Sequence, residues 1–191
     1  MRTLTYYVAV SLDGFIAGPN GEFDGFLFEG DHMAAIISKY PDTLPAHVHD
    51  MVGVSPSGER FDTVLMGWNT YAVGLTDGAD SPYSHLRQYV FSRHERTVPD
   101  DIRLVRDNPL ETVRALKAEP DGTCIWLCGG GELAAEIRDE IDELVLKINP
   151  VVFGSGTPLF GDSSYQIDRF ARVSVDAYDS GVTMATFRRP A

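Results

Sequence analysis

Three short segments place glycine, hydroxyl or guanidinium groups directly after an apolar run. The most distinctive is WLCGGGELAAEI, where Gly129–Gly131 follow a strand-like run and open a helical pattern. Glycines let the backbone approach a ligand closely, and a helix that begins there offers unpaired N–H groups and a dipole that favours negative charge. This pattern indicates a diphosphate site, although a tight turn without a ligand would also explain it. It is neither a GxGxxG nor a Walker motif, which disfavours a standard Rossmann or ATP site.

Two further segments follow the same rule. In VLMGWNTYAVG, Gly67 ends a strand-like run and Thr70 lies at the start of a helix, where its hydroxyl could cap the helix or bind a phosphate. In VFSRHER, Ser92 and Arg93 come just after another strand-like run. A guanidinium suits a terminal phosphate such as the 2′-phosphate of NADP, although a solvated arginine would look the same. Together the three segments favour a phosphate-rich dinucleotide as the ligand.

These groups can act together only if the elements before them share one sheet. Strand-like runs alternate with helical patterns, which predicts a mostly parallel sheet with helices on both faces. Ligands bind at the carboxyl ends of such strands. The expected strands are residues 4–14, 61–67, 88–92, 102–106 and 123–128, and the expected helices are residues 31–39, 68–75, 109–119 and 131–140, with Asp31 as a plausible N-cap.

The remaining segments break this alternation. After Glu140, three strand-like runs at 143–154, 170–178 and 182–189 have no helix between them, which predicts antiparallel strands at the C-terminal edge. The glycine-rich segment 15–26 reads as a long mobile loop, and Asp13 is expected to fix the turn before it. Residues 40–60, interrupted by proline and glycine, read as an irregular insertion. We therefore expect one α/β domain spanning residues 1–191.

Charge and composition argue against several classes of partner. The 191 residues include 16 Lys plus Arg and 28 Asp plus Glu, so the net charge is 16 − 28 = −12. Such an acidic chain argues against a nucleic-acid partner, which needs a basic surface. No run approaches the length of a membrane span and no signal peptide is evident, so we expect a cytoplasmic protein with no membrane partner. His47 and His49 lack a third ligand, so no metal site is expected.

The order of these segments resembles a known superfamily. SLDGFIA, FDTVLMGWNTY, VFSR, WLCGGGELAAEI and DELVLKINPVVFGSGTPLF stand in the order seen in dihydrofolate reductase-like proteins. The closing GSGTPLF and the preceding DEL favour the branch of the reductase domain of the bifunctional riboflavin-biosynthesis deaminase-reductase. The similarity covers nearly the whole chain. It implies a mixed, largely parallel sheet and hydride transfer from NADPH, and it implies a homodimer.

The resemblance also assigns cofactor contacts. Ala9 and Ile16 would lie beside the nicotinamide, and Ser92 and Arg93 would hold the 2′-phosphate. Many relatives carry a basic residue where this chain has Trp68, so its preference for NADPH over NADH would rest on Arg93. The other implied contacts are Gly67, Trp68 and Thr70 at the adenosine-side phosphates, and Gly129, Gly130, Gly131, Glu132 and Leu133 at the diphosphate.

The substrate side is less defined. Relatives that reduce dihydrofolate use a carboxylic acid near the first helix, and Glu29 falls at that place with Asp24 close by. Such a group could protonate or orient a ring nitrogen, although a solvated loop acid would look the same. We expect a conjugated pterin-like or pyrimidine-like substrate. The alternatives are a pyrimidine reductase of riboflavin synthesis, with Arg60 or Arg87 receiving a substrate phosphate, and a non-catalytic nucleotide-binding module. The zinc deaminase signature is absent.

Overall fold

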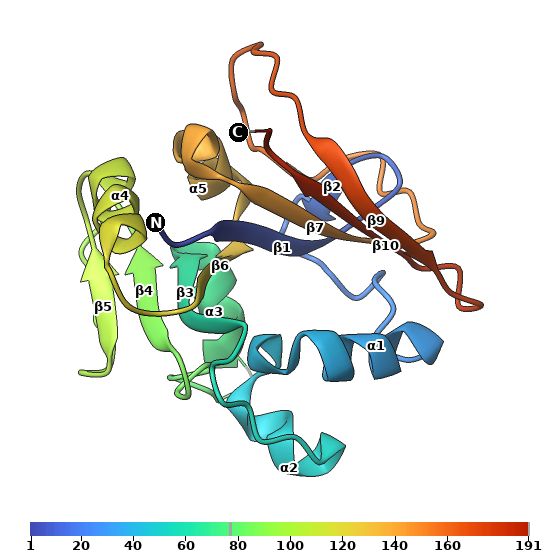
Figure 1. The fold of residues 1–191 in the computed structure, drawn as a ribbon, viewed down its shortest axis with the longest axis horizontal. Helices are drawn as coiled ribbons and strands as arrows, with labels where there is room; N and C mark the ends of the chain where they lie inside the picture. The colour runs from blue at the N-terminus through green and yellow to red at the C-terminus, as the bar shows by residue number, and fades with distance from the viewer. Residues whose placement is uncertain (77, 191) are drawn as a thin grey trace.

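A computed structural model describes residues 1–76 and 78–190. An eight-stranded sheet runs through the molecule in the order β5-β4-β3-β6-β1-β7-β10-β9 (Figure 1). A separate two-stranded ladder pairs β2 with β8. Six neighbouring strands, from β5 to β7, are parallel, whereas β10 is antiparallel to both β7 and β9. The strands are β1 (Leu4–Val10), β2 (Phe15–Ala17), β3 (Phe61–Gly67), β4 (Arg87–Phe91), β5 (Ile102–Val105), β6 (Cys124–Gly129), β7 (Glu143–Ile148), β8 (Thr157–Pro158), β9 (Ala171–Ala177) and β10 (Thr183–Arg188).

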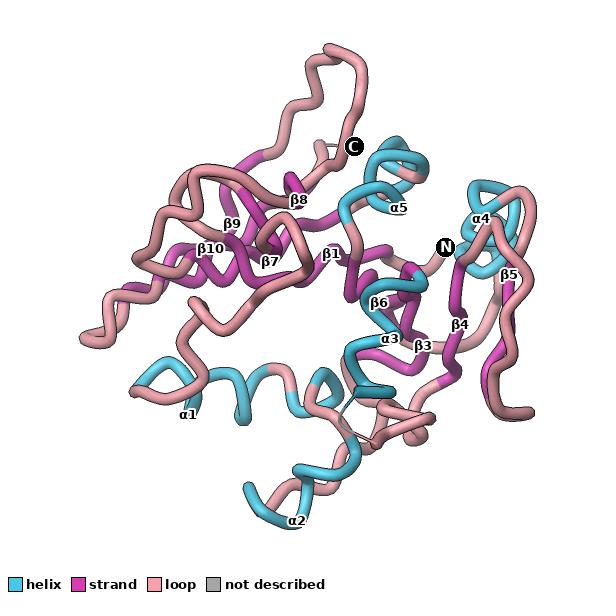
Figure 2. The backbone as a smooth tube through the Cα atoms, turned by 180° about the vertical axis from the view of Figure 1, so that it is seen from behind, coloured by secondary structure: helices cyan, strands magenta, loops and turns pink. Residues whose placement is uncertain are grey.

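Helices cover both faces of the sheet. They are α1 (Asp31–Lys39), α2 (His49–Val52), α3 (Trp68–Thr76), α4 (Pro109–Ala118) and α5 (Gly131–Glu136). Seen from behind, α1 and α2 lie on one side, and α4 and α5 on the other (Figure 2). One apolar core joins α4 and α5 to the sheet through residues such as Val113 and Ile137, and a second joins α1 and α3 through Ile36 and Tyr71. The predicted fold class, a largely parallel α/β sheet with antiparallel C-terminal strands, is confirmed.

Several elements differ in extent from the prediction. The first strand ends at Val10 because the Ser11 hydroxyl accepts the Phe15 N–H and donates to Asp13, closing a turn. Asp13 also accepts the N–H groups of Phe153 and Gly154, which fixes the turn as expected. The segment expected as a loop from residue 15 begins with β2. The long strand expected from residue 143 stops at Ile148, two residues before Pro150.

The helix boundaries also shift. The final helix ends at Glu136 and continues as a 3-10 turn, Arg138–Glu140. The N-cap of α1 is Gly30, so the expectation that Asp31 is the cap was wrong. The Asp31 carboxylate instead accepts the N–H groups of Asp179 and Ser180, which ties the start of α1 to the β9–β10 turn.

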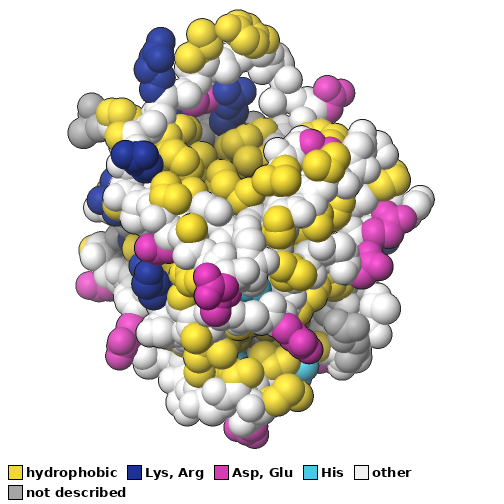
Figure 3. All heavy atoms as spheres, turned by 90° about the vertical axis from the view of Figure 1, so that its right-hand side faces the viewer, with side chains coloured by type: hydrophobic (Ala, Val, Ile, Leu, Met, Phe, Trp, Pro, Cys, Tyr) yellow, Lys and Arg dark blue, Asp and Glu magenta, His cyan; other side chains and the backbone are white. Residues whose placement is uncertain are grey.

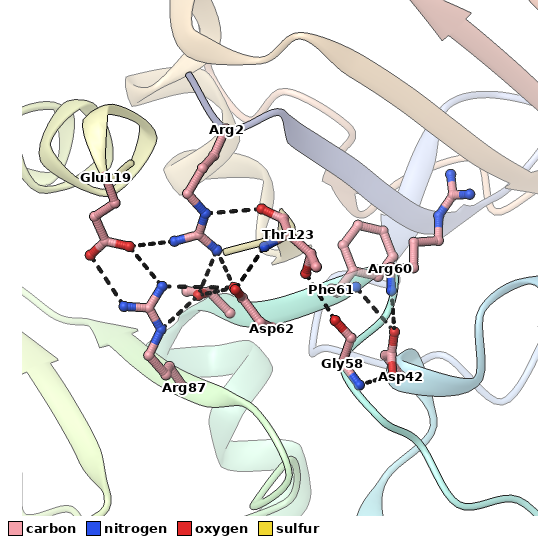
Figure 4. A network of polar contacts seen from close by, with 10 residues as sticks. Arg2, Asp42, Gly58, Arg60, Phe61, Asp62, Arg87, Glu119 and Thr123 are labelled. Atoms are coloured by element: carbon pink, nitrogen blue, oxygen red, sulfur yellow. Dashed lines mark hydrogen bonds and ion pairs between the residues drawn. The ribbon is translucent and has the colours of Figure 1, made fainter. Parts of the chain in front are cut away.

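Two polar networks, one partly exposed and one buried, secure the amino ends of the strands (Figure 4). Arg2 donates to Asp62 and Glu119, and Arg87 also pairs with Glu119, so the starts of β1, β3 and β4 are tied to the end of α4. In the second network, Asp42 is 1% exposed and accepts three backbone N–H groups at 3.0 Å, from Gly58, Arg60 and Phe61.

The second network gives the proline- and glycine-rich segment its shape. Residues 40–60 contain two 3-10 turns, Pro41–Thr43 and Ala46–Val48, followed by the single turn of α2. One carboxylate therefore closes this segment onto the start of β3. No helix among the described residues is both long and apolar enough to cross a membrane.

Candidate functional site

The carboxyl ends of β3 and β6 meet almost without side chains between them. A Cβ atom at Gly67 would lie 3.2 Å from the amide nitrogen of Gly130, and one at Gly129 would lie 3.0 Å from Thr70 Oγ1. The peptide between Gly129 and Gly130 is cis. Gly67, the first turn of α3 and the glycine run, which the sequence predicts to act together, therefore lie side by side in the fold.

The start of α5 is held by the segment that carries β8. A Cβ atom at Gly131 would lie 2.2 Å from the carbonyl oxygen of Pro158, so only glycine fits this position. β8 in turn pairs with β2, which carries Ile16. Leu133, on α5, is buried in the core. The expected diphosphate cradle and the expected cover of the nicotinamide are thus linked through one short ladder.

An exposed ion pair bridges the end of β4 and α5. Arg93 Nη2 lies 2.7 Å from Glu132 Oε2, and the two side chains are 81% and 76% exposed. A surface pair of this kind contributes little to stability, so the guanidinium can exchange its partner at low cost. A hollow of about 460 Å³ opens beside it, between α5 and residues 162–166. The Ser92 hydroxyl is buried and donates to the carbonyl of His94.

A second arginine lies at this edge that the sequence reasoning missed. The guanidinium carbon of Arg96 is 4.4 Å from the centre of the Trp68 ring, a cation–π geometry. Trp68 begins α3 beside Gly67, so Arg96 brings a positive charge to the position where the resemblance expects a basic residue. Its place in a loop after β4, 28 positions along the chain from Trp68, gave no signal in the sequence.

The two acids expected at the substrate side lie on the surface. Asp24 and Glu29 belong to the segment between β2 and α1 and are exposed. Ala9 lies near the end of β1, in the centre of the sheet, and Ile16 lies in β2; both are half-buried. In the β1–β7 register Ala9 is paired with Lys147, so both side chains point to the face covered by α1.

Lys147 and His32 form a buried polar group that the sequence reasoning also missed. Lys147 is 6% exposed and its ammonium donates to the carbonyl of Leu27; His32 is fully buried, and its Nε2 lies 3.2 Å from the same oxygen. Asn149 accepts the Leu27 N–H at 3.0 Å. Burial lowers the pKa of Lys147 to about 8. A lysine inside the apolar strand ELVLKI was the available signal.

Comparison with protein families gives one match along nearly the whole chain. The model of the RibD C-terminal domain matches residues 2–184. Two curated proteins of Bacillus subtilis (strain 168) are similar and are both described as uncharacterized. YyaP is 30% identical over 97% of this chain and 94% of its own length, and YwjB is 32% identical over 83% of each chain.

Solved structures agree with these matches. A putative riboflavin biosynthesis protein from Shewanella sp. PV-4 has a TM-score of 0.72 and 26% identity, and the alignment covers both chains fully. A deaminase/reductase from Thermotoga maritima has a TM-score of 0.66 and 18% identity over 99% of this chain and 57% of that longer chain. Dihydrofolate reductase from Enterococcus faecalis, complexed with NADP(H), has a TM-score of 0.65 and 15% identity over 99% and 97%.

Proposed function

Because the chain belongs to the RibD C-terminal domain family, we propose that it is a reductase that transfers hydride from NADPH to a conjugated pterin-like or pyrimidine-like heterocycle. The observation that supports this most is the meeting of β3, β4 and β6 at one edge of the sheet. There, side-chain-free backbone, the Thr70 hydroxyl and two arginines lie together. Phosphate groups need this combination of close backbone approach and guanidinium charge.

The described residues fit NADPH at this edge. The close approach of Gly67 and Gly130 leaves backbone rather than side chains at the expected diphosphate position. The backbone of Gly129, Gly131, Glu132 and Leu133 would line the same position. Arg93 and Arg96 would hold the 2′-phosphate, with Arg93 exchanging Glu132 for it and Ser92 shaping the turn. Trp68 and Thr70 would line the adenosine side, and Ala9 and Ile16 the nicotinamide. When bound, NADPH supplies the hydride.

The chain's own residues would orient the substrate and supply a proton. In this proposal Glu29 or Asp24 protonates the ring after hydride transfer. Their exposure means that either acid would have to turn toward the substrate as it binds. Glu29→Gln and Asp24→Asn should then each be compared with wild type for turnover against pH, with Glu22→Gln as a control in the same loop.

The pyrimidine reductase of riboflavin synthesis is the second candidate, supported by the family and by the activity for which the Thermotoga protein is named. It needs a site for the substrate phosphate. Arg60 and Arg87, the cations considered for it from the sequence, lie at the amino ends of the strands. Arg60 pairs with Glu143 and Arg87 with Glu119, away from Gly67 and Gly129. Faster NADPH oxidation with the phosphorylated than with the dephosphorylated ribosylaminouracil would favour this candidate.

The decisive test is nucleotide binding. NADPH and then NADH are titrated into the wild-type protein and Arg93→Ala, following fluorescence of Trp68 and Trp126. NADPH should bind more tightly than NADH, and Arg93→Ala should weaken NADPH binding toward the NADH value, with Arg96 retaining part of the preference. Arg114→Ala is the control, because Arg114 is also an exposed arginine in an ion pair at 2.7 Å, with Glu140, but it lies on α4. Failure of both nucleotides to bind would exclude the reductase.

The alternative from the sequence, a non-catalytic nucleotide-binding module, would bind NADPH but oxidise none of it in single-turnover mixtures with candidate heterocycles. This result would distinguish it from an enzyme.

We also propose that the protein is a cytoplasmic homodimer, as expected from the sequence. The exposed Val173 and Val175 on the edge strand β9 support a dimer. Figure 3 shows apolar side chains gathered in a concave area on one face of the molecule.

A further inference from the structure

Lys147 stands apart from the other lysines of the chain. The sequence has three, at positions 39, 117 and 147. Lys39 pairs with Asp176 on the surface, and Lys117 pairs with Glu140 and Asp142. Lys147 is almost fully buried, and within the described residues it takes part in no ion pair. A buried charge without a counter-ion is costly, so the position calls for an explanation.

The surroundings of Lys147 leave part of its ammonium unused. An ammonium has three N–H donors, and Lys147 has one hydrogen-bond acceptor among the described residues, the carbonyl of Leu27. The Phe28 ring lies 5.4 Å from Nζ and adds a weak cation–π contact. Two of its three N–H donors therefore have no hydrogen-bond partner among the described residues.

A rigid frame holds the ammonium in place. Asn149 accepts the N–H of Leu27, while Lys147 and His32 both approach its carbonyl, so the backbone of Leu27 is held on both sides of its Cα atom. Because a carbonyl can only accept, His32 Nε2 carries the proton and Nδ1 accepts from Ser180 Oγ at 3.0 Å. Burial chiefly lowers the pKa of His32 and nearby Lys147 lowers it further, while Asp31 opposes both. Neutral His32 therefore leaves Lys147 as the cation of this group.

The frame lies beside the expected reaction centre. Ala9, which would contact the nicotinamide, is paired with Lys147 across the β1–β7 ladder. The segment that Lys147 holds, around Leu27, also lies between the two candidate acids. The other cations at this edge, Arg93 and Arg96, lie in the loop after β4, which is separated from β1 by β3 and β6 in the strand order. Lys147 is thus the cation placed to meet the substrate rather than the nucleotide phosphates.

We propose that Lys147 binds an oxo group of the substrate heterocycle, conjugated to the carbon that accepts the hydride. The inference rests on the proposed function and narrows its substrate class to oxo-substituted rings. Hydride brings an electron pair to the ring carbon, the π pair of the adjacent double bond forms a new double bond to the carbonyl carbon, and the C=O π pair moves onto the oxo oxygen. The ammonium stabilises that oxyanion, and a proton then adds at the ring atom next to the reduced carbon. NADPH, the ring and one proton give NADP⁺ and the dihydro ring.

Such a contact also selects against amino-substituted rings. An amino group in place of the oxo group offers donors to a donor and places N–H groups against a buried positive charge. A charge-assisted hydrogen bond is worth about 1.5–3 kcal/mol, which corresponds to roughly tenfold or more in affinity. The pocket should therefore distinguish two ligands that differ in one oxygen.

The test uses isocytosine and 2,4-diaminopyrimidine, which differ only in an oxo and an amino group. Both are titrated into the intact protein with and without NADPH, following the ¹³Cε signals of labelled lysine. Three lysines make assignment direct, since Lys147→Met removes one signal. Isocytosine should shift the Lys147 signal and bind about tenfold more tightly than the diamino ring, and Lys147→Met should remove that preference. Lys39→Met, which removes an exposed lysine, should retain it.

Three results would overturn the proposal: an unchanged preference in Lys147→Met, tighter binding of the diamino ring to wild type, or no shift of the Lys147 signal with either ring. NADPH binding to Lys147→Met, measured by tryptophan fluorescence, should match wild type and shows that the variant is folded. Loss of NADPH binding in the wild-type protein would instead contradict the proposed function. The ring preference in the nucleotide-free protein still decides the role of Lys147 in that case.

Discussion

Lys147 links a stability cost to the expected site. Its pKa of about 8 lies below the 10.5 of an ordinary lysine because burial disfavours the charged form. Between these two values the folded protein binds fewer protons at this residue than the unfolded chain does. The penalty for burying the cation is therefore present in full below pH 8 and is relieved as the pH rises toward 10.5. Natural sites retain such costs when the group has a function.

We predict that Lys147→Met changes how stability depends on pH. At pH 7 the variant should be more stable than wild type in urea denaturation, because methionine fills the space without a charge. The difference in the free energy of unfolding between the variant and the wild type should fall by about 3 kcal/mol as the pH rises from 7.5 to 10.5. Lys39→Met is the control. The pKa of Lys39 is raised, chiefly by its hydrogen bond to Asp176, so its removal should give no such fall. A pH-independent difference for Lys147→Met would contradict the prediction.

Arg96 offers a second test at the residue scale. Its guanidinium covers Trp68 and stands close to the expected 2′-phosphate. Arg96→Gln should weaken NADPH binding about fivefold, leave NADH binding nearly unchanged and alter Trp68 emission in the free protein. The control is Arg103→Gln, which removes an arginine on β5 that lies 5.8 Å from the ring of Tyr89 on β4. Equal weakening of NADPH and NADH would show that Arg96 does not contact the 2′-phosphate.

Among the elements, the segment between α1 and β3 depends on one carboxylate. Asp42 accepts three backbone N–H groups, and an asparagine in its place would turn one acceptor into a donor facing those groups. Asp42→Asn should therefore lower the free energy of unfolding by roughly 2–3 kcal/mol and speed proteolysis within residues 44–60. Asp50→Asn, an exposed change on α2 in the same segment, should do neither. Equal stability of the two variants would show that the network is dispensable.

The order of the elements could be predicted because each has a local cause. The apolar runs of β3 and β6, Pro109 at the start of α4 and the glycines before α5 are visible in short windows of sequence. The boundaries of the helices and strands were harder to predict, because they depend on contacts with residues far away in the sequence. β8 has two residues and no pattern of its own, and it exists because it pairs with β2. Asp31 is not a cap because its carboxylate is taken by the β9–β10 turn.

The same distinction applies to the candidate site. Residues that follow strands could be found, since the carboxyl ends of parallel strands share an edge. The burial of Lys147 could not be predicted from the sequence, because it arises from β7, the Leu27 segment and α1 together. Arg96 likewise reaches Trp68 only after folding. Glu29 and Asp24 were selected by counting along the chain, and their roles stay predictions.

At the scale of the whole molecule, the net charge opposes self-association, whereas the apolar side chains on the edge strand β9 favour it. Each copy carries a formal charge of −12, which opposes self-association at low ionic strength. The edge strand β9 is largely exposed and presents Val173 and Val175, 53% and 49% exposed. Burial of such side chains would favour pairing, and salt would screen the repulsion. We therefore predict that a homodimer formed through β9 is stronger at high than at low salt.

Sedimentation equilibrium tests this prediction. The wild-type protein should approach twice its mass of 21.0 kDa, with the dissociation constant falling as NaCl rises from about 20 to 500 mM. Val173→Glu should shift the protein to monomer by placing a charge in the apolar contact, while Arg172→Gln, an exposed change one position away, should leave the dimer intact. A monomer at every salt concentration would remove the dimer from the proposal. A dimer unaffected by Val173→Glu would place the contact elsewhere, because a buried carboxylate without a partner cannot be tolerated at an apolar interface.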